Sequence, residues 1–214
     1  MDGTLEIRVI QPEEAHKIVK FLVENFFAHA PLSSCHPKNV LTAEDEAKLC
    51  KCIEIYGCSI MALEGDELVG VCVALPKNRS SIDEYFQQAD ELGKDNKNGQ
   101  ILRLLGEVNR DAGIFDRYGV EEILYLFLAS VATSHGGRNI ATRMTQEWMR
   151  LGKLWNYQVL SMDCSSYYCA RVCERLGMEC LNTVLFDEYR DDSGNPIFKP
   201  ALPHVAMKTF AQRL

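Results

Sequence analysis

Residues 123–131 form the most apolar stretch of this 214-residue chain, and a glycine-bearing loop follows the stretch directly. The run reads ILYLFLASV without the polar–apolar alternation of a half-buried strand, so it predicts a strand that is buried on both faces. Beyond the loop, residues 140–151 carry apolar side chains at helical spacing. A buried strand that leads through a short loop into an amphipathic helix is typical of sheets covered by helices, which places the chain in the α/β class.

The remaining elements follow from the same kind of pattern. Strands are expected at residues 5–9, 59–63, 68–75, 158–162, 181–189 and 204–210. A first helix is expected to begin at Pro12 and to be ended by Pro31, and a second to run from the Thr42–Asp45 capping pair to about residue 55. Further helices are expected over residues 82–92, 101–115, 140–151 and 166–176. This order predicts one mixed α/β domain over residues 1–214, with a helical pair inserted at about residues 77–118.

The charge balance argues against nucleic acid as a partner. The chain has 23 Lys and Arg against 30 Asp and Glu, a net charge of −7, whereas phosphate binding requires a basic face. An acidic surface is compatible with a small cationic substrate and equally with solubility alone. No apolar stretch approaches the roughly 20 residues of a membrane helix, so no membrane partner is expected.

The nine cysteines are expected to be free thiols in a reducing compartment. No CxxC motif occurs, and the Cys35–His36 pair has no further ligands at suitable spacing, so no metal is expected. The first residues carry neither the basic nor the apolar region of a secretory signal. We therefore expect a cytoplasmic protein that is a monomer or a weak dimer.

The loop between the buried strand and its helix is a candidate anion site. Its sequence, VATSHGGRNIAT over residues 131–142, leaves several backbone N–H groups free at the positive end of the helix, where a pyrophosphate can bind. Arg138 would add positive charge and Thr142 a hydroxyl. The loop matches neither the GxxxxGK[ST] nor the GxGxxG pattern. The alternative is a tight strand–helix turn that binds nothing.

A second polar segment follows the strand at residues 158–162. Small hydroxyls, a thiol and two tyrosines occur together in DCSSYYCARVCERLGM, residues 163–178. Serines at a helix start often serve only as caps. Their position directly after a strand is nevertheless where open α/β sheets bind ligands.

Together these two segments resemble the GCN5-related N-acetyltransferase (GNAT) superfamily. The family's pyrophosphate motif, [QR]-x-x-G-x-[GA], falls on residues 136–141, where Gly136 replaces the usual Gln or Arg and Asn139 the usual Gly. Asn tolerates positive φ better than most residues, so the loop can keep its shape. Within the superfamily, NFF at residues 25–27, Pro31-Leu32 and residues 164–172 are similar to the insect arylalkylamine N-acetyltransferases, which acetylate amines such as dopamine and serotonin.

The resemblance implies a mixed, mostly antiparallel sheet with a splayed central parallel strand pair flanked by helices. It also implies acetyl-CoA as co-substrate, a small primary amine as acceptor, direct attack of the amine on the thioester, and no metal. The residues expected to hold acetyl-CoA are Leu128, Ala129, Ser130, Val131, Gly136, Gly137, Arg138, Asn139, Ile140, Ala141, Thr142 and Ser166.

The catalytic candidates implied by the resemblance depart from the family's pattern. The usual catalytic glutamate falls on Ala30, and the two active-site serines fall on Ser165 and Cys169. The superfamily's tyrosine acid falls on Cys173, which leaves Cys169, Cys173 or Tyr168 to protonate the departing thiolate. For Cys173, packing in the core is the favoured alternative.

Without the glutamate, the substrate range is expected to be atypical and to favour weakly basic amines or hydrazine. Glu24, Asp163 or Glu188 are alternative bases from other elements. Three other functions stay open: a CoA-binding protein that has lost catalysis, a polyamine acetyltransferase, and an α/β interaction domain whose glycine loop binds no ligand.

Overall fold

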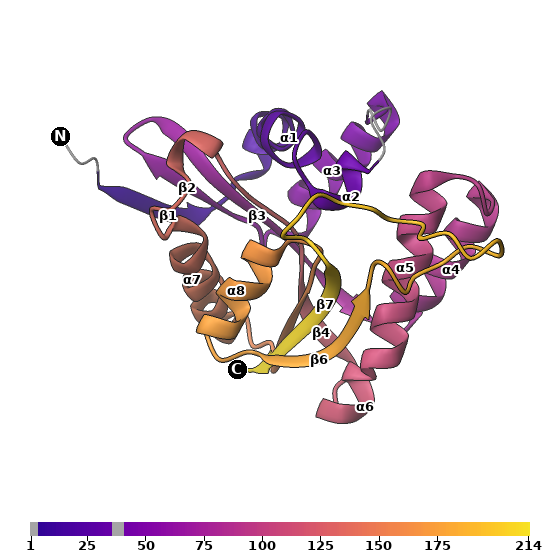
Figure 1. The fold of residues 1–214 in the computed structure, drawn as a ribbon. Helices are drawn as coiled ribbons and strands as arrows, with labels where there is room; N and C mark the ends of the chain where they lie inside the picture. The colour runs from indigo at the N-terminus through magenta and orange to yellow at the C-terminus, as the bar shows by residue number, and fades with distance from the viewer. Residues whose placement is uncertain (1–3, 36–40) are drawn as a thin grey trace.

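The computed structural model describes residues 4–35 and 41–214, which build one seven-stranded sheet of order β1-β2-β3-β4-β5-β7-β6 (Figure 1). The strands are β1 (Leu5–Val9), β2 (Ile60–Glu64), β3 (Glu67–Asn78), β4 (Glu122–Val131), β5 (Val159–Cys164), β6 (Glu179–Leu185) and β7 (Ala206–Arg213). All neighbouring strands are antiparallel except β4 and β5, which are parallel. The predicted class, a mixed and mostly antiparallel sheet with one central parallel pair, is confirmed.

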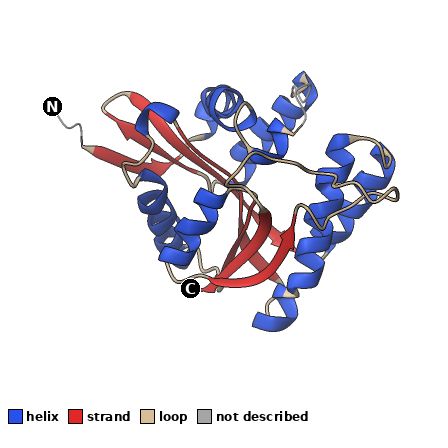
Figure 2. Ribbon diagram, viewed as in Figure 1, coloured by secondary structure: helices blue, strands red, loops and turns tan. Residues whose placement is uncertain are grey.

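Helices cover both faces of the sheet (Figure 2). They are α1 (Ala15–Leu22), α2 (Pro31–Ser34), α3 (Ala43–Tyr56), α4 (Ser80–Leu92), α5 (Lys97–Ala112), α6 (Ile114–Tyr118), α7 (Ile140–Leu154) and α8 (Tyr167–Arg175). Two short 3-10 helices, η1 (Pro12–Glu14) and η3 (Thr133–His135), precede α1 and α7, and a π-helix, η2 (Val23–Phe27), continues α1. One apolar cluster joins α7 and α8 to the sheet, and a second joins α1 and α3 to the opposite face (Figure 1). Within the described residues, no helix is long and apolar enough to cross a membrane.

Several expected boundaries were wrong. The strand expected at residues 181–189 is β6, which ends at Leu185, and three other differences have a local reason. Pro31 begins helix α2 instead of ending a longer one, because proline suits the first helical position, where no N–H partner is needed. Strand β3 continues through Pro76 to Asn78, because residues 76–78 still pair with β4. The helix expected over residues 101–115 is two helices, since Gly113 adopts the left-handed conformation (φ 57°) that ends α5.

The parallel pair opens into a splay toward its C-terminal ends. Pairing between β4 and β5 covers only Leu124–Leu126 against Leu160–Met162, although β4 continues to Val131. Strand β3 keeps pairing with β4 up to Val131, and β7 keeps pairing with β5 up to Cys164. The expectation that residues 123–131 are buried holds for Ile123–Leu126 and for Leu128. It is wrong for Phe127, which is 38% exposed, and for residues 129–131, which are exposed or half-buried.

An irregularity in β4 accompanies this opening. Val73 pairs with Leu128 and Ala74 with Leu126, so Phe127 is an extra residue in the ladder. A bulge of this kind reverses the face on which the following side chains lie. Accordingly, Leu126 packs in the α7–α8 cluster and Leu128 in the α1–α3 cluster. The bulge thus bends β4 where the splay begins.

Candidate active site

The expected acetyl-CoA residues lie on the free side of β4 and on the loop that follows it. Ala129 is exposed and Ser130 and Val131 are half-buried, whereas Leu128 is buried in the core on the α1–α3 side. Beyond the last β4–β5 pair, the side of β4 that faces β5 has no strand partner. Free backbone N–H and C=O groups in such an opening can pair with amide groups of a ligand. The expected acetyl-CoA residues of β4 and of its loop therefore lie together where β4 and β5 separate. Leu128 is the exception, because its side chain packs in the core.

The glycine loop leads from this strand into α7. Gly137 (φ 77°) and Asn139 (φ 63°) both adopt the left-handed conformation, and α7 begins at Ile140. Residues 136–139 and Ala141 are exposed, while Ile140 and Thr142 are buried. The loop thus presents backbone N–H groups at the positive end of a 15-residue helix, a suitable site for a pyrophosphate.

A carboxylate that the sequence did not single out lies beside this loop. The guanidinium of Arg138 donates to both carboxylate oxygens of Glu64, at 2.8 Å and 2.5 Å, and His135 Nε2 lies 3.0 Å from Glu64 Oε2. The pKa of Glu64 is lowered, chiefly by the hydrogen bonds from Arg138. Glu64 is the last residue of β2, so this ion pair ties the loop to the sheet. It also pairs the guanidinium of Arg138, which we expected to face the phosphates. Only tertiary structure could pair residues so distant in sequence.

The start of α8 carries two of the catalytic candidates, Ser165 and Tyr168, and the cofactor-binding candidate Ser166. Ser165 and Ser166 are half-buried and Tyr168 is 64% exposed. The ring of Tyr168 lies edge-to-face against Tyr167 (5.6 Å) and against His204 (5.7 Å). These hydroxyls and rings occupy the C-terminal end of β5, next to the splay. They form a polar and aromatic edge on which an amine can be bound.

His204 was missed as a candidate, because the sequence placed it at the start of a closing strand. Its Nδ1 accepts a hydrogen bond from the Tyr167 N–H at 3.1 Å, so it satisfies one of the free donors at the start of α8. Burial lowers the pKa of His204 below 6.5. Both effects favour the neutral imidazole near neutral pH.

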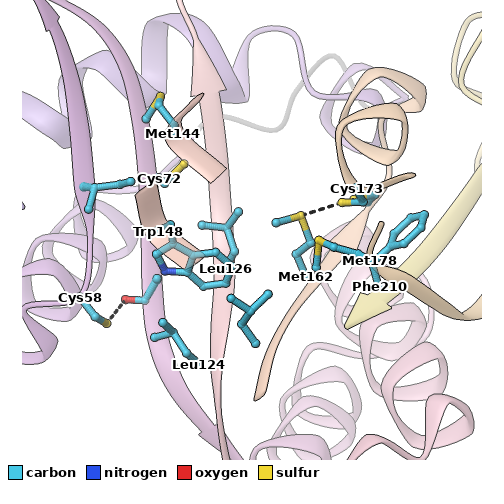
Figure 3. Close-up of a cluster of buried hydrophobic side chains, with 14 of the residues drawn as sticks. Cys58, Cys72, Leu124, Leu126, Met144, Trp148, Met162, Cys173, Met178 and Phe210 are labelled. Atoms are coloured by element: carbon cyan, nitrogen blue, oxygen red, sulfur yellow. Dashed lines mark hydrogen bonds between the residues drawn. The ribbon is translucent and has the colours of Figure 1, made fainter. Parts of the chain in front are cut away.

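The thiol candidates divide by exposure. Cys169 is half-buried, and its Sγ lies 3.2 Å from Cys164 Sγ. Cys173 is fully buried, with its Sγ 3.1 Å from the Met162 sulfur (Figure 3). The hydrogen bond with Cys164 lowers the pKa of Cys173, but the hydrogen bond with Cys169 and burial together outweigh it, so the pKa of Cys173 is raised. The structure thus brings Cys169 to the opening and places Cys173 behind it, in the α7–α8 core.

The position of the family's glutamate is occupied by buried Ala30, which precedes α2. Of the alternative bases, Glu24 is exposed on η2 and Glu188 is exposed in the turn after β6. Asp163 is half-buried on β5, the strand that borders the splay. Its carboxylate accepts hydrogen bonds from Asn109 (2.6 Å), Tyr125 (2.7 Å) and Thr209 (2.6 Å). Three donors hold Asp163 in one orientation.

Asp163 belongs to a buried polar network that the sequence did not reveal. Lys77 is 2% exposed, and its Nζ donates to Asn109 Oδ1 at 2.9 Å. The same ammonium lies 3.9 Å from the Tyr125 ring centroid and 4.7 Å from that of Tyr85. Burial lowers the pKa of Lys77 to about 8, although the charge of Asp163 opposes this shift. The network joins β3, α5, β4 and β5 beneath the opening.

Three solved structures are similar to this protein over nearly its whole length. A Drosophila melanogaster polyamine N-acetyltransferase that forms N-acetylagmatine is 26% identical, with a TM-score of 0.88 over 99% of this chain and 100% of that one. An agmatine N-acetyltransferase is 27% identical, with a TM-score of 0.89 over 98% and 99%. A mosquito arylalkylamine N-acetyltransferase-like protein is 25% identical, with a TM-score of 0.88 over 99% and 100%. No family model matches the chain.

The fold and the splayed strand pair are thus GNAT-like, as in these neighbours. Within the GNAT superfamily, the chain resembles the insect arylalkylamine and polyamine N-acetyltransferases. The resemblance stated from the sequence is confirmed, and the activities of these neighbours agree with the predicted enzyme class.

The Cys35–His36 pair was considered as a metal ligand in the sequence. Cys35 lies in the described part of the chain, whereas His36 lies outside the described residues.

Proposed function

We propose that this protein transfers acetyl from acetyl-CoA to a small primary amine. The observation that carries the proposal is the end of β4–β5 pairing at Leu126 and Met162, five residues before β4 itself ends and the loop to α7 begins. The opening thus combines a free strand edge, which can bind the extended pantetheine arm of acetyl-CoA, with an anion site for the pyrophosphate of the same molecule. Five residues of β4 lie beyond the last pair with β5, enough to hold a pantetheine arm by its amides.

Each part of the opening has a role in this proposal. Backbone groups of Ala129 and Val131 pair with the pantetheine amides, and N–H groups from Gly136 to Thr142 hold the pyrophosphate. A backbone N–H near Ala129 and Ser130 polarises the thioester carbonyl as an oxyanion-hole donor. Ser166, directly before α8, is the expected acetyl-CoA residue on the β5 side of the opening. Acetyl-CoA supplies the thioester that the amine attacks.

The protons move through groups at the start of α8. The amine nitrogen forms the new bond to the acetyl carbon and releases one proton to water, since Ala30 supplies no carboxylate to take it. The carbon–sulfur bond breaks, the thiolate takes a proton from Tyr168 or Cys169, and that side chain regains a proton from water. In this proposal, Ser165 orients the amine at the same edge. The fully buried Cys173 acts as a packing residue behind this site. The product is an N-acetyl amine together with free CoA.

The amine is an arylalkylamine or a polyamine, and the structure supports both classes. The exposed aromatic edge of Tyr167 and Tyr168 suits an aromatic ring. The net charge of −7 suits a di-cation, and two of the neighbours described above act on agmatine or polyamines. Because Ala30 replaces the glutamate, weakly basic nucleophiles such as hydrazine should be accepted better than their size suggests.

The deciding experiment is an amine panel with acetyl-CoA. Dopamine, serotonin, agmatine and hydrazine are each supplied to the reduced protein, and thioester loss is followed. Turnover of any one of them supports the proposal. Acetyl-CoA binding without turnover of any amine would indicate instead a CoA-binding protein that has lost catalysis, and no binding would indicate an interaction domain.

Gly137→Asp tests the phosphate loop within the same experiment. The new carboxylate would lie against the phosphates, so acetyl-CoA affinity should fall at least tenfold, about 1.4 kcal/mol. Gly194→Asp is the matched control, because Gly194 also has positive φ (82°) and open space around its Cα. Equal affinities of the two variants would show that the cofactor is held elsewhere.

A further inference from the structure

Three cysteines from two elements meet behind the splay. Cys164 ends β5, and Cys169 and Cys173 lie one turn apart on the same face of α8. Their sulfur atoms all lie within 4.8 Å of one another. The spacing, Cys-x4-Cys-x3-Cys, crosses from a strand into a helix and gives no metal motif in the sequence. Only the packing of α8 on β5 brings the thiols together.

A fourth sulfur completes the group. The thioether of Met162 lies 3.1 Å from Cys173 Sγ and 4.0 Å from Cys169 Sγ, and Cys164 Sγ lies 3.2 Å and 3.6 Å from the other two thiols. Metal–sulfur bonds of about 2.3 Å place sulfur ligands roughly 4 Å apart. Outward movements of a few tenths of an ångström therefore admit an ion between these four atoms.

The chemistry of the donors selects the ion. Among residues 4–35 and 41–214, these three thiols are the group of His, Cys, Asp or Glu side chains that meets at metal-binding distance. A ligand set of thiolates and a thioether favours the soft ion Cu(I), since zinc sites use thiolate, imidazole or carboxylate ligands. The carboxylate of Asp163, next in sequence, is occupied by three donors in the polar network.

The site also has an entry side and a dry interior. Cys169 is half-buried at the mouth of the splay, whereas Cys164 and Cys173 are 1% and 0% exposed. Ala170 belongs to the same core cluster. So do Met178 and Phe210, which lie near Cys173 (Figure 3). Cys169 is the third residue of α8, where the positive end of the helix offsets thiolate charge.

We propose that Cys164, Cys169, Cys173 and Met162 form a buried binding site for one Cu(I) ion. Binding displaces the thiol protons to water and ties α8 to β5 through metal–sulfur bonds. Cu(I) binding is measured without acetyl transfer, so the site is tested separately from the proposed function. With Cu(I) bound, Cys169 has no thiol proton, and Tyr168 is the remaining proton donor of the proposed reaction.

The test is anaerobic competition with a chromogenic Cu(I) chelator, using reduced protein in which all nine thiols have been counted. The wild type should retain one equivalent of Cu(I), and its melting temperature should rise. Cys169→Ser, at the half-buried position, should fold and lose at least tenfold in affinity, and Cys173→Ser should lose as much. Met162→Leu keeps the thiols, and it should weaken Cu(I) binding while leaving Zn(II) binding unchanged.

Cys50→Ser is the matched control, because Cys50 is another buried thiol with a candidate ligand beside it, His16 Nδ1 at 3.6 Å. This variant should bind Cu(I) as the wild type does. The proposal is overturned if the wild type yields all its Cu(I) to the chelator. It is also overturned if Cys169→Ser and Cys50→Ser lose affinity equally, or if Zn(II) binds as tightly as Cu(I).

Discussion

Asn139 shows how one residue preserves the phosphate loop after an unusual replacement. It stands where the GNAT motif usually has glycine, and it adopts the left-handed backbone conformation with φ 63°. Asn visits this region more readily than other non-glycine residues, because its short side chain hydrogen-bonds locally. Here its Oδ1 accepts a hydrogen bond from Arg175 of α8 at 3.2 Å. The expectation that asparagine tolerates positive φ here is confirmed.

Replacing Asn139 by Val should destabilise the loop, since a β-branched side chain is strained at positive φ. The free energy of unfolding should fall by about 1–2 kcal/mol, and acetyl-CoA affinity should fall with it. Asn139→Gly is the control and should retain both within a few tenths of a kcal/mol. Urea denaturation and acetyl-CoA titration measure the two quantities. Equal behaviour of Val and Gly would show that loop conformation does not limit binding.

Ala30 should give the enzyme a rate that depends steeply on pH. A primary alkylamine has a pKa near 10.4, so about one molecule in a thousand is neutral at pH 7.4. A positioned carboxylate typically contributes 10²–10⁴-fold by removing that proton. We therefore expect slow turnover of dopamine near neutrality, a rate that climbs past pH 8, and a faster relative rate with hydrazine.

A pH–rate series on the wild type and Ala30→Glu checks this expectation. The glutamate variant should gain most at pH 7 and little above pH 9. If the wild type instead reaches a plateau near pH 7 with dopamine, another group supplies the base. Asp163, half-buried at the splay, would then be the first candidate.

At the scale of elements, the polar network around Lys77 explains why β3 runs farther than its apolar pattern. The ammonium is fixed by Asn109 of α5 and by the rings of Tyr85 and Tyr125, from α4 and β4. These contacts hold the last residues of β3 against the helices that follow. They also join the helices of residues 80–112 to the sheet beneath the splay.

Lys77 should make stability rise with pH. Its pKa is about 8 in the folded protein, against 10.5 when unperturbed, so between these values the unfolded chain binds the extra proton. The free energy of unfolding therefore increases through this window, by roughly 1–3 kcal/mol. Buried thiols act in the opposite direction: burial raises the pKa of Cys52 to about 11 and that of Cys58 to about 12.

Comparison with Lys77→Met isolates the lysine from the thiols. From pH 7.5 to 9.5 the difference in unfolding free energy should shift in favour of the wild type. Parallel pH profiles for the two proteins would show that Lys77 keeps an ordinary pKa. Denaturant midpoints at constant ionic strength provide the measurement.

At the scale of the whole molecule, the splay divides the sheet into two halves. Strands β1–β4 form one half and β5, β7 and β6 the other, joined by three paired positions between β4 and β5. A ligand that pairs with β4 across the opening would add contacts between the halves. The described structure thus has a narrow backbone connection where the proposed cofactor would bind.

Acetyl-CoA should therefore protect this region and stabilise the fold. Backbone amides of residues 127–142 should exchange more slowly with the ligand present, while those of β1 should change little. The melting temperature should rise with a free-energy gain of about 2.7 kcal/mol at 100 times the Kd. Protection confined to another part of the chain would place the cofactor elsewhere.

The sequence alone determined those features that depend on neighbouring residues. Apolar periodicity located most strands and helices, the Thr42–Asp45 capping pair was confirmed, and the loop before α7 was recognised from its glycines. Boundaries near Pro31, Pro76 and Gly113 were misplaced, because each depends on whether a partner strand or a helix cap is present.

Tertiary structure decided every feature that joins distant residues. Glu64 with Arg138, Lys77 with Asn109, and His204 with Tyr167 all combine elements that lie apart in sequence. The three thiols are near in sequence, but they meet only because α8 packs on β5. Local patterns record backbone preference and one-sided burial, both short-range effects. The partner of a buried charge or thiol is set by how elements pack, and no spacing rule in a single sequence encodes that choice.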